Sequence, residues 1–292
     1  MKLLSLLAPL LPLLPFSQAQ GGLTQVTSFG SNPSNAKMFL YVPANVAESP
    51  AVVVAIHYCT GTAQAYFGGS PYRQLADSKG FIVIYPESPY SGTCWDVSSR
   101  ATLTHEGGAN SNSIANMVRY VIDKYSADPA KVFVTGTSSG AMMTNVLAAT
   151  YPDMFAAGIV YSGVPAGCFF TNSVNGWNNT CAQGQVTSTP ERWAQWVTDA
   201  YPDYDGPRPR MQIYHGSADT TLGANNYAET IKQWCGVFGC DPNAPEETAQ
   251  NTPQASYTKK TYAGGQLVGI YAQGVGHSVP MRGADDMAFF GL

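Results

Sequence analysis

A strand pattern, a serine flanked by glycines and a helix pattern follow one another without interruption at residues 131–147. The β-rich run 131–135 leads into Gly-Thr-Ser-Ser-Gly at 136–140, and an apolar helical run comes directly after it. The two glycines of this segment permit a turn around the central serine that is too tight for residues with side chains. Such a turn lifts the Oγ of Ser138 above the sheet and points the helix N-terminus toward it. We predict that Ser138 is a nucleophile; Ser139 lies one place off the centre, and an ordinary strand-to-helix turn is the alternative.

Apolar runs rich in β-branched residues alternate with helical patterns along the whole chain. The β-rich runs lie at 38–42, 51–57, 81–85, 131–135, 157–162 and 211–214, and the helical patterns at 72–79, 112–125, 141–151, 191–200 and 224–238. Two stretches, 52–56 and 81–84, are continuously apolar, which is typical of strands buried on both faces of a sheet. We therefore predict an α/β fold with a mainly parallel sheet, helices on both faces and a site beyond the carboxyl ends of the strands.

The first residues have the pattern of a secretion signal. Lys2 precedes an apolar run that ends at Phe16, and a small-x-small cleavage sequence follows at 17–19. The run is shorter than the ~20 apolar residues that a membrane-spanning helix needs, and it contains prolines. No repeat, charge block or linker comes later. We expect a signal peptide at 1–19, one domain at 20–292, and a secreted protein without a membrane anchor.

Composition excludes several classes of protein. Apolar residues make up 45% of the 292 residues and charged residues only 12%, which excludes a disordered chain. The net charge is −4, which disfavours a nucleic-acid partner. We therefore expect a folded domain with a sizeable core that binds neither nucleic acid nor membranes.

The six cysteines fit an exported chain and predict three disulfides. No spacing among them matches a CxxC zinc site, so we expect no metal. Several connectivities are possible. Short sequence separations favour Cys168–Cys181 and Cys235–Cys240, and the remaining expected pair is Cys59–Cys94.

A nucleophilic serine needs a base, almost always histidine, that is oriented by a carboxylate. The chain has four histidines, and the order expected for this fold is serine, acid, histidine. Only His215 and His277 follow Ser138, and His215 ends a strand, where we expect it to pack in the turn. His277 lies in a loop after a β-rich run and is the predicted base; a histidine at the surface is the alternative.

Asp219 is the best candidate for the carboxylate. It lies between the serine and the histidine in the chain, four residues past the end of a strand. The other acidic residues considered lie on helix ends or in proline-rich stretches and are expected to be solvated. These alternatives are Asp199, Asp203, Asp205, Glu229 and Asp241.

The oxyanion that forms when a serine attacks a carbonyl group needs two N–H donors. The first is predicted at Ser139, and the second in the loop that begins at His57. Here we favour Cys59 over Tyr58, and a Cys59–Cys94 disulfide would fix the loop and bring Trp95 beside the serine as a cleft wall. A simple strand-end turn is the alternative. Two other tryptophans, Trp193 and Trp196, are three apart on a helix and are expected to face the core.

With these residues in place, the sequence resembles the fungal acetyl xylan esterases of carbohydrate esterase family 1, which are related to feruloyl esterases and secreted polyhydroxybutyrate depolymerases. The segments that carry the resemblance are 50–63, 94–96, 128–143, 215–219 and 274–280. The resemblance implies an α/β-hydrolase fold, a triad of Ser138, Asp219 and His277, and no metal or cofactor. One departure is Tyr58, where many relatives have glycine; it places an aromatic ring near the cleft entrance, as a substrate-binding candidate.

The resemblance implies a secreted, monomeric serine esterase that removes acetyl groups from acetylated xylan in plant cell walls through an acyl-enzyme. Feruloyl esterase is the first alternative and polyester depolymerase the second. A carbohydrate-binding protein on an inactive hydrolase fold is a further alternative, against which the intact triad argues. Asn178 begins the one N-glycosylation sequence, in the loop between Cys168 and Cys181.

Overall fold

A mixed sheet runs through the centre of the structure, a computed structural model that describes residues 21–292. The predicted signal peptide at 1–19 lies outside the described residues. Ten strands follow the spatial order β1-β2-β4-β3-β5-β6-β7-β10-β9-β8. The six neighbouring strands β4, β3, β5, β6, β7 and β10 run parallel to one another. Antiparallel strands extend the sheet at both edges. The strands are β1 (Thr24–Val26), β2 (Lys37–Tyr41), β3 (Val52–Ile56), β4 (Ile82–Glu87), β5 (Val132–Thr137), β6 (Ala157–Tyr161), β7 (Arg210–Gly216), β8 (Glu247–Gln250), β9 (Tyr257–Tyr262) and β10 (Leu267–Ala272).

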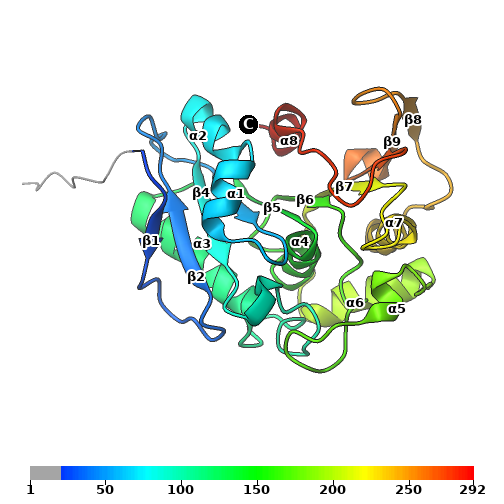
Figure 1. Cartoon of the computed structure of the whole chain (residues 1–292), viewed down its shortest axis with the longest axis horizontal. Coiled ribbons are helices and arrows are strands. Elements are labelled where there is room, and N and C mark those ends of the chain that lie inside the picture. Colours follow the sequence, from blue (N-terminus) through cyan, green and yellow to red (C-terminus); the bar gives the residue numbers. More distant parts are fainter. Residues whose placement is uncertain (1–20) are drawn as a thin grey trace, which may run out of the picture.

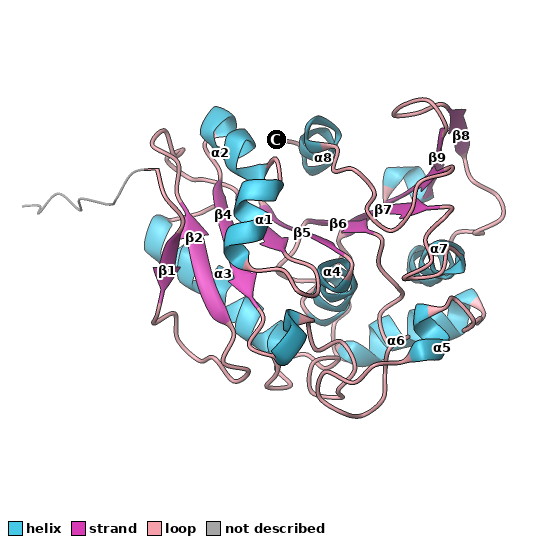
Figure 2. Cartoon of the chain, in the orientation of Figure 1, coloured by secondary structure: helices cyan, strands magenta, loops and turns pink. Residues whose placement is uncertain are grey.

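Helices cover both faces of this sheet (Figures 1 and 2). They are α1 (Ala63–Gly69), α2 (Tyr72–Lys79), α3 (Asn110–Tyr125), α4 (Ser139–Thr150), α5 (Asn179–Ala182), α6 (Pro190–Ala200), α7 (Asn225–Phe238) and α8 (Gly283–Phe290). Among the described residues, short 3₁₀ turns occur at Ser91–Thr93 and Ala263–Gly265. Helices α1, α2 and α8 pack on one face of the sheet, with α2 and α8 at the top of Figure 1, and α3, α4 and α7 pack on the other face. The predicted α/β architecture is confirmed.

Strand β3 shows why the central strands read as unbroken apolar runs. All five of its residues are buried. Val53 and Ala55 pack in the core beneath α1, α2 and α8, whereas Val52, Val54 and Ile56 pack toward α3 and α4. Because parallel strands join through crossover helices, both faces of β3 are covered and all its side chains are apolar. The carboxyl ends of β3, β5, β7 and β10 therefore share one edge of the sheet.

Three disulfides use all six cysteines, with the predicted pairs. Cys59–Cys94 joins the loop after β3 to the loop after β4. Cys168–Cys181 closes the long loop before α5, and Cys235–Cys240 closes the end of α7. Across residues 21–292, no helix combines the length and the apolar composition that a bilayer span requires.

A buried carboxyl group ties α8 to the sheet. Asp286 is fully buried, and its two oxygens accept hydrogen bonds from the hydroxyls of Tyr72 (2.8 Å) and Tyr161 (2.6 Å). The Tyr161 hydroxyl in turn accepts the backbone N–H of Arg282 (2.9 Å). Burial raises the pKa of Asp286 to about 7, even though both tyrosine hydroxyls favour the charged form.

We expect this carboxyl to make the protein less stable as the pH rises from about 4 to about 7. In that window the folded state holds a proton that the unfolded state has released, so the free energy of unfolding falls with pH, by at most ~1.4 kcal/mol per pH unit for one proton. Asp286→Asn removes the titration and should flatten this part of the curve, as measured by urea unfolding between pH 4 and 8. The exposed Asp123→Asn serves as the control. Parallel curves for wild type and Asp286→Asn would contradict the expectation.

Candidate active site

Ser138 lies on the sharp turn between β5 and α4. Its backbone has φ 56° and ψ −120°, a conformation that is uncommon for a residue with a side chain. The turn is held by hydrogen bonds from the Ser138 N–H to the Tyr161 carbonyl (2.9 Å) and from the Met142 N–H to the Ser138 carbonyl (2.9 Å). This geometry is the nucleophile elbow that the glycine-flanked serine predicts, with the side chain raised at the end of the sheet.

The two glycines of the turn allow α4 to lie directly against the sheet. A Cβ on Gly136 would stand 2.4 Å from the carbonyl oxygen of Gly140. A Cβ on Gly140 would stand 2.2 Å from the carbonyl oxygen of Ile56 and 2.6 Å from that of His57. These neighbours are backbone atoms and cannot rotate away, so a larger residue at 136 would push α4 away from β5, and one at 140 would push it away from β3.

The structure brings the three predicted residues together in one hydrogen-bonded row. The Oγ of Ser138 donates to Nε2 of His277 at 2.8 Å, and Nδ1–H of His277 donates to Oδ2 of Asp219 at 2.8 Å. Asp219 lies in the turn after β7, and His277 lies in the loop between β10 and α8. The His277 side chain is 22% exposed whereas that of Asp219 is fully buried, so solvent reaches the row at Ser138 and His277 but not at the carboxylate. This is the arrangement that makes a serine hydroxyl nucleophilic.

Asp219 is held as a carboxylate. Burial alone would raise its pKa, but hydrogen bonds from His215, His277 and the Leu222 N–H outweigh burial and hold the pKa of Asp219 well below its usual range. Its other oxygen, Oδ1, accepts the backbone N–H groups of Thr221 and Leu222, each at 2.9 Å. The negative charge thus persists at neutral pH and is fixed in direction.

Two backbone N–H groups near Ser138 have no acceptor among the described residues. Ser139 is the first residue of α4, where an N–H has no partner within the helix. The N–H of Cys59 is also without a partner, although its loop neighbours are bonded: Thr60 donates to Gly92 (2.7 Å) and Gly61 donates to Tyr58 (3.0 Å). These are the two donors predicted for the oxyanion, and the Cys59–Cys94 disulfide fixes the loop that carries one of them.

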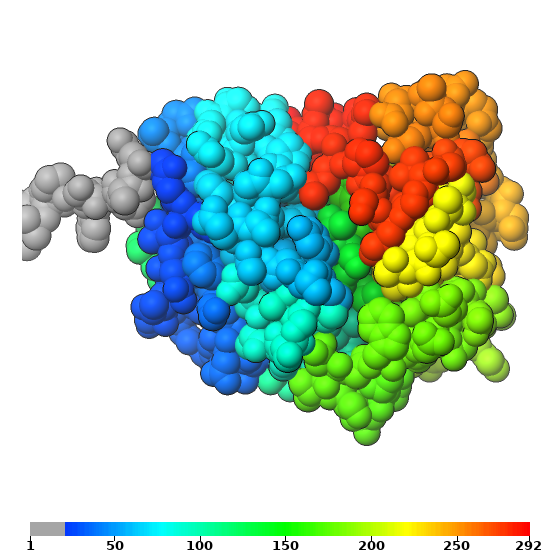
Figure 3. Space-filling view, in the orientation of Figure 1, coloured from blue at the N-terminus to red at the C-terminus, as the bar shows by residue number. Residues whose placement is uncertain are grey.

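A pocket of about 870 Å³ opens over the serine. Figure 3 shows the hollow between the segment before residue 100, in blue to cyan, and the C-terminal segment, in red. Tyr58, 37% exposed, lines it beside Cys59, Ser138 and His277. The further lining residues are Thr60, Gly68, Gly69, Ser70, Pro71, Gln74, Thr137, Thr221, Ser278, Val279, Pro280 and Met281. The lining includes no Lys, Arg, Asp or Glu, so the pocket suits an uncharged ligand.

Trp95 does not form a wall of this pocket, contrary to the sequence-based expectation. It is only 2% exposed, and its Nε1–H donates to the carbonyl oxygen of His57 at 2.9 Å. The reason is that the hydrogen bond to His57 and a ring contact with the His57 imidazole (5.1 Å between centroids) hold the indole in the core at the end of β3. As expected, Trp193 is buried and Trp196 packs against the core.

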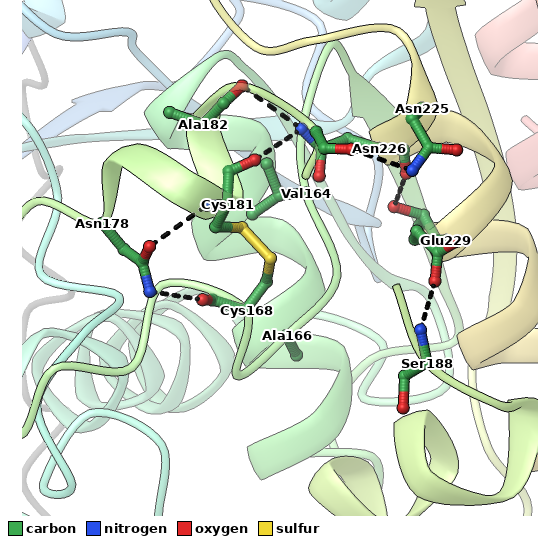
Figure 4. Close-up of a disulfide and its surroundings, with 12 residues drawn as sticks. Val164, Ala166, Cys168, Asn178, Cys181, Ala182, Ser188, Asn225, Asn226 and Glu229 are labelled. Atoms are coloured by element: carbon green, nitrogen blue, oxygen red, sulfur yellow. Dashed lines mark hydrogen bonds between the residues drawn. A yellow bond between two sulfur atoms is a disulfide. The ribbon is translucent and has the colours of Figure 1, made fainter. Parts of the chain in front are cut away.

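Asn178 holds the loop that Cys168 and Cys181 close (Figure 4). Its Oδ1 accepts the N–H of Cys181 (3.1 Å) and thereby caps α5, while its Nδ2 donates to the carbonyl of Cys168 (3.2 Å). The same loop carries Trp177, which is 55% exposed. Glycosylation of Asn178 stays a prediction.

Within residues 21–292, no group of three His, Cys, Asp or Glu side chains could hold a metal.

Sequence reasoning missed one contact of His215. The expected packing in the turn is observed, since Nε2 of the buried ring lies 2.9 Å from the Leu222 carbonyl oxygen, but the same atom also lies 3.3 Å from Oδ2 of Asp219, which was not foreseen. The four-residue spacing in His-Gly-Ser-Ala-Asp, directly after a strand, was the available signal. The pocket residues contributed by α1, α2 and the loop before α8 also gave no sequence signal.

Comparisons with known proteins match this chain to esterases. The esterase PHB depolymerase family profile matches residues 36–234. Acetylxylan esterase A of Aspergillus oryzae is 64% identical over 93% of this chain and 89% of its own, and the probable acetylxylan esterase A of Aspergillus clavatus is 66% identical over the same shares. A solved acetyl xylan esterase from Aspergillus awamori superposes with a TM-score of 0.91, at 64% identity, over 93% of this chain and 99% of that one. A feruloyl esterase module from Clostridium thermocellum, with a TM-score of 0.55 and 13% identity over 88% of this chain and 82% of that one, shares the fold.

Proposed function

Because the chain belongs to the esterase PHB depolymerase family, together with the Aspergillus acetylxylan esterases that it matches, we propose that it is a serine esterase that removes acetyl groups from acetylated xylan. The observation that carries this proposal is the hydrogen-bonded row of Ser138, His277 and Asp219 at the floor of an uncharged pocket. The α/β-hydrolase fold alone would leave the reaction open, since one fold hosts many functions.

The mechanism follows from the geometry. Ser138 Oγ attacks the acetyl carbonyl while His277 Nε2 takes its proton, and Asp219 stabilises the resulting imidazolium. The N–H groups of Cys59 and Ser139 hold the oxyanion. His277 then protonates the departing sugar oxygen, which leaves an acetyl ester on Ser138. Water attacks this ester while His277 takes its proton, and His277 then returns the proton to Ser138 Oγ as acetate leaves.

The lining of the pocket supports a neutral acyl group and a neutral sugar. Hydroxyl and amide groups at its rim, such as those of Thr60, Gln74 and Ser278, can exchange hydrogen bonds with sugar hydroxyls. The ring of Tyr58 at the entrance supplies a flat apolar face for either the acyl group or the sugar. We further propose that the enzyme is secreted, as a monomeric domain of residues 20–292 after cleavage at 19. The three disulfides support secretion, because disulfides form and persist in oxidising compartments.

The experiment that tests this function compares two natural substrates. The purified protein is incubated with acetylated xylan and, separately, with feruloylated arabinoxylan, and the released acetate and ferulate are quantified by chromatography. Ser138→Ala provides the blank. We expect acetate far above the blank and little ferulate. If ferulate predominated, the enzyme would be a feruloyl esterase that uses the same triad. If neither acid rose above the blank, the proposal would be overturned.

A further inference from the structure

A second histidine lies against the carboxylate of the proposed triad. His215 is the sixth residue of β7, its side chain is 1% exposed, and it does not line the pocket. It therefore cannot touch a substrate bound over Ser138. Burying an imidazole costs free energy unless its nitrogen atoms form hydrogen bonds, so a buried histidine at this position requires an explanation.

The contacts of His215 define its protonation. Nε2 lies 2.9 Å from the carbonyl oxygen of Leu222 and 3.3 Å from Oδ2 of Asp219. Since both atoms are acceptors, Nε2 must carry the proton and donate. Nδ1 is buried and has no partner among the described residues, so a second proton there would have no acceptor. These contacts fit a neutral His215 with its N–H at Nε2.

The same contacts close a small ring around the Asp219 turn. His215 donates to the carbonyl of Leu222, and the N–H of Leu222 donates to Oδ1 of Asp219 at 2.9 Å. The other oxygen, Oδ2, lies between Nε2 of His215 and Nδ1 of His277. Both oxygens of the carboxylate are thus fixed by groups of this ring or by His277.

The charged side chains of the helix that packs against β7 are already paired with each other. Helix α7 packs against β7 and carries two charged side chains, Glu229 and Lys232, which bond to each other at 2.7 Å. Glu229 also accepts the Trp193 indole N–H at 2.7 Å. Of the described ionisable groups, only His215 and His277 form an ion-pair-distance contact with Asp219.

We propose that His215 is a positioning residue of the esterase: its neutral Nε2–H holds the Asp219 turn and directs Oδ2 toward His277. This inference rests on the proposed function. As a second donor near Oδ2, His215 also takes up part of the carboxylate charge. Removing it should therefore loosen the carboxylate and at the same time strengthen its attraction for a protonated His277.

Three substitutions separate this role from simple packing. His215→Leu keeps an apolar volume but has no donor. His215→Gln carries an N–H at the distance of Nε2, and His215→Asn is the matched control whose shorter amide cannot reach Asp219. We expect Leu and Asn to lower kcat on an acetyl ester about 10- to 100-fold with little change in KM, because a small misplacement of a catalytic group costs rates of this order. Gln should recover most of the activity.

The pH profile gives the second readout. In His215→Leu and His215→Asn the acid limb of kcat/KM should move to higher pH than in wild type and in His215→Gln. Equal losses for Gln and Asn with an unmoved acid limb would overturn the inference. If Leu does not fold, as judged by thermal melting, the Gln and Asn pair still decides. A wild type without esterase activity would instead refute the proposed function.

Discussion

Replacing Ser138 by alanine will lower kcat for acetyl ester hydrolysis by about 10⁵-fold or more, with the fold unchanged. The side chain is the only attacking group in the row, and its Oγ contributes no buried packing that the structure depends on. His277→Ala will cost about as much, because an unassisted serine hydroxyl is a poor nucleophile. Steady-state kinetics on 4-nitrophenyl acetate, with circular dichroism for the fold, will measure both.

The two changes will not add. Because Ser138 and His277 act as one unit, the double variant should be about as slow as either single variant. Ser139→Ala is the matched control: it removes a neighbouring hydroxyl but keeps the backbone N–H, so its kcat should stay close to wild type. A Ser139→Ala enzyme that is as inactive as Ser138→Ala would place the nucleophile one residue further along.

Gly140→Ala should destabilise the protein by about 3 kcal/mol or more, or prevent it from folding. The new methyl would stand 2.2 Å from the Ile56 carbonyl oxygen and 2.6 Å from that of His57. Relief requires α4 to move away from β3, and this movement would also shift the loop that carries Cys59. Any folded fraction should therefore have a lower kcat. Urea unfolding and esterase assays will measure the two effects.

Gly22→Ala provides the comparison, since a Cβ there meets nothing within 4 Å. It should change the free energy of unfolding by no more than about 0.5 kcal/mol. If Gly140→Ala were as stable and as active as Gly22→Ala, the close approach of the elbow to β3 would not be a requirement of this fold.

The parts of the fold that the sequence predicted are those set by local pattern. Strand β3 is marked by an unbroken apolar run and the elbow at Ser138 by glycines at fixed positions, and both can be read directly from the sequence. The order of serine, acid and histidine then left few candidates, and the structure places Asp219 and His277 in one row with the serine.

Other features depend on tertiary packing and carry little local pattern. Helix α8 is a short helix in which two aspartates precede its apolar residues, and nothing in its own sequence shows that Asp286 turns inward between two tyrosines. Trp95 follows Cys94 in the chain, but the side of the loop on which its indole lies is decided by the hydrogen bond to the His57 carbonyl. The contact between His215 and Asp219 likewise depends on the conformation of the turn that follows β7.

The most direct test of the account is to trap the acyl-enzyme. The enzyme is mixed with acetylated xylooligosaccharides, quenched with acid during turnover and digested, and the peptides are analysed by tandem mass spectrometry. We expect the mass of one acetyl group on Ser138, and none in Ser138→Ala. Rapid acetate release with no acetyl group on Ser138, or with the acetyl group on another residue, would contradict the account.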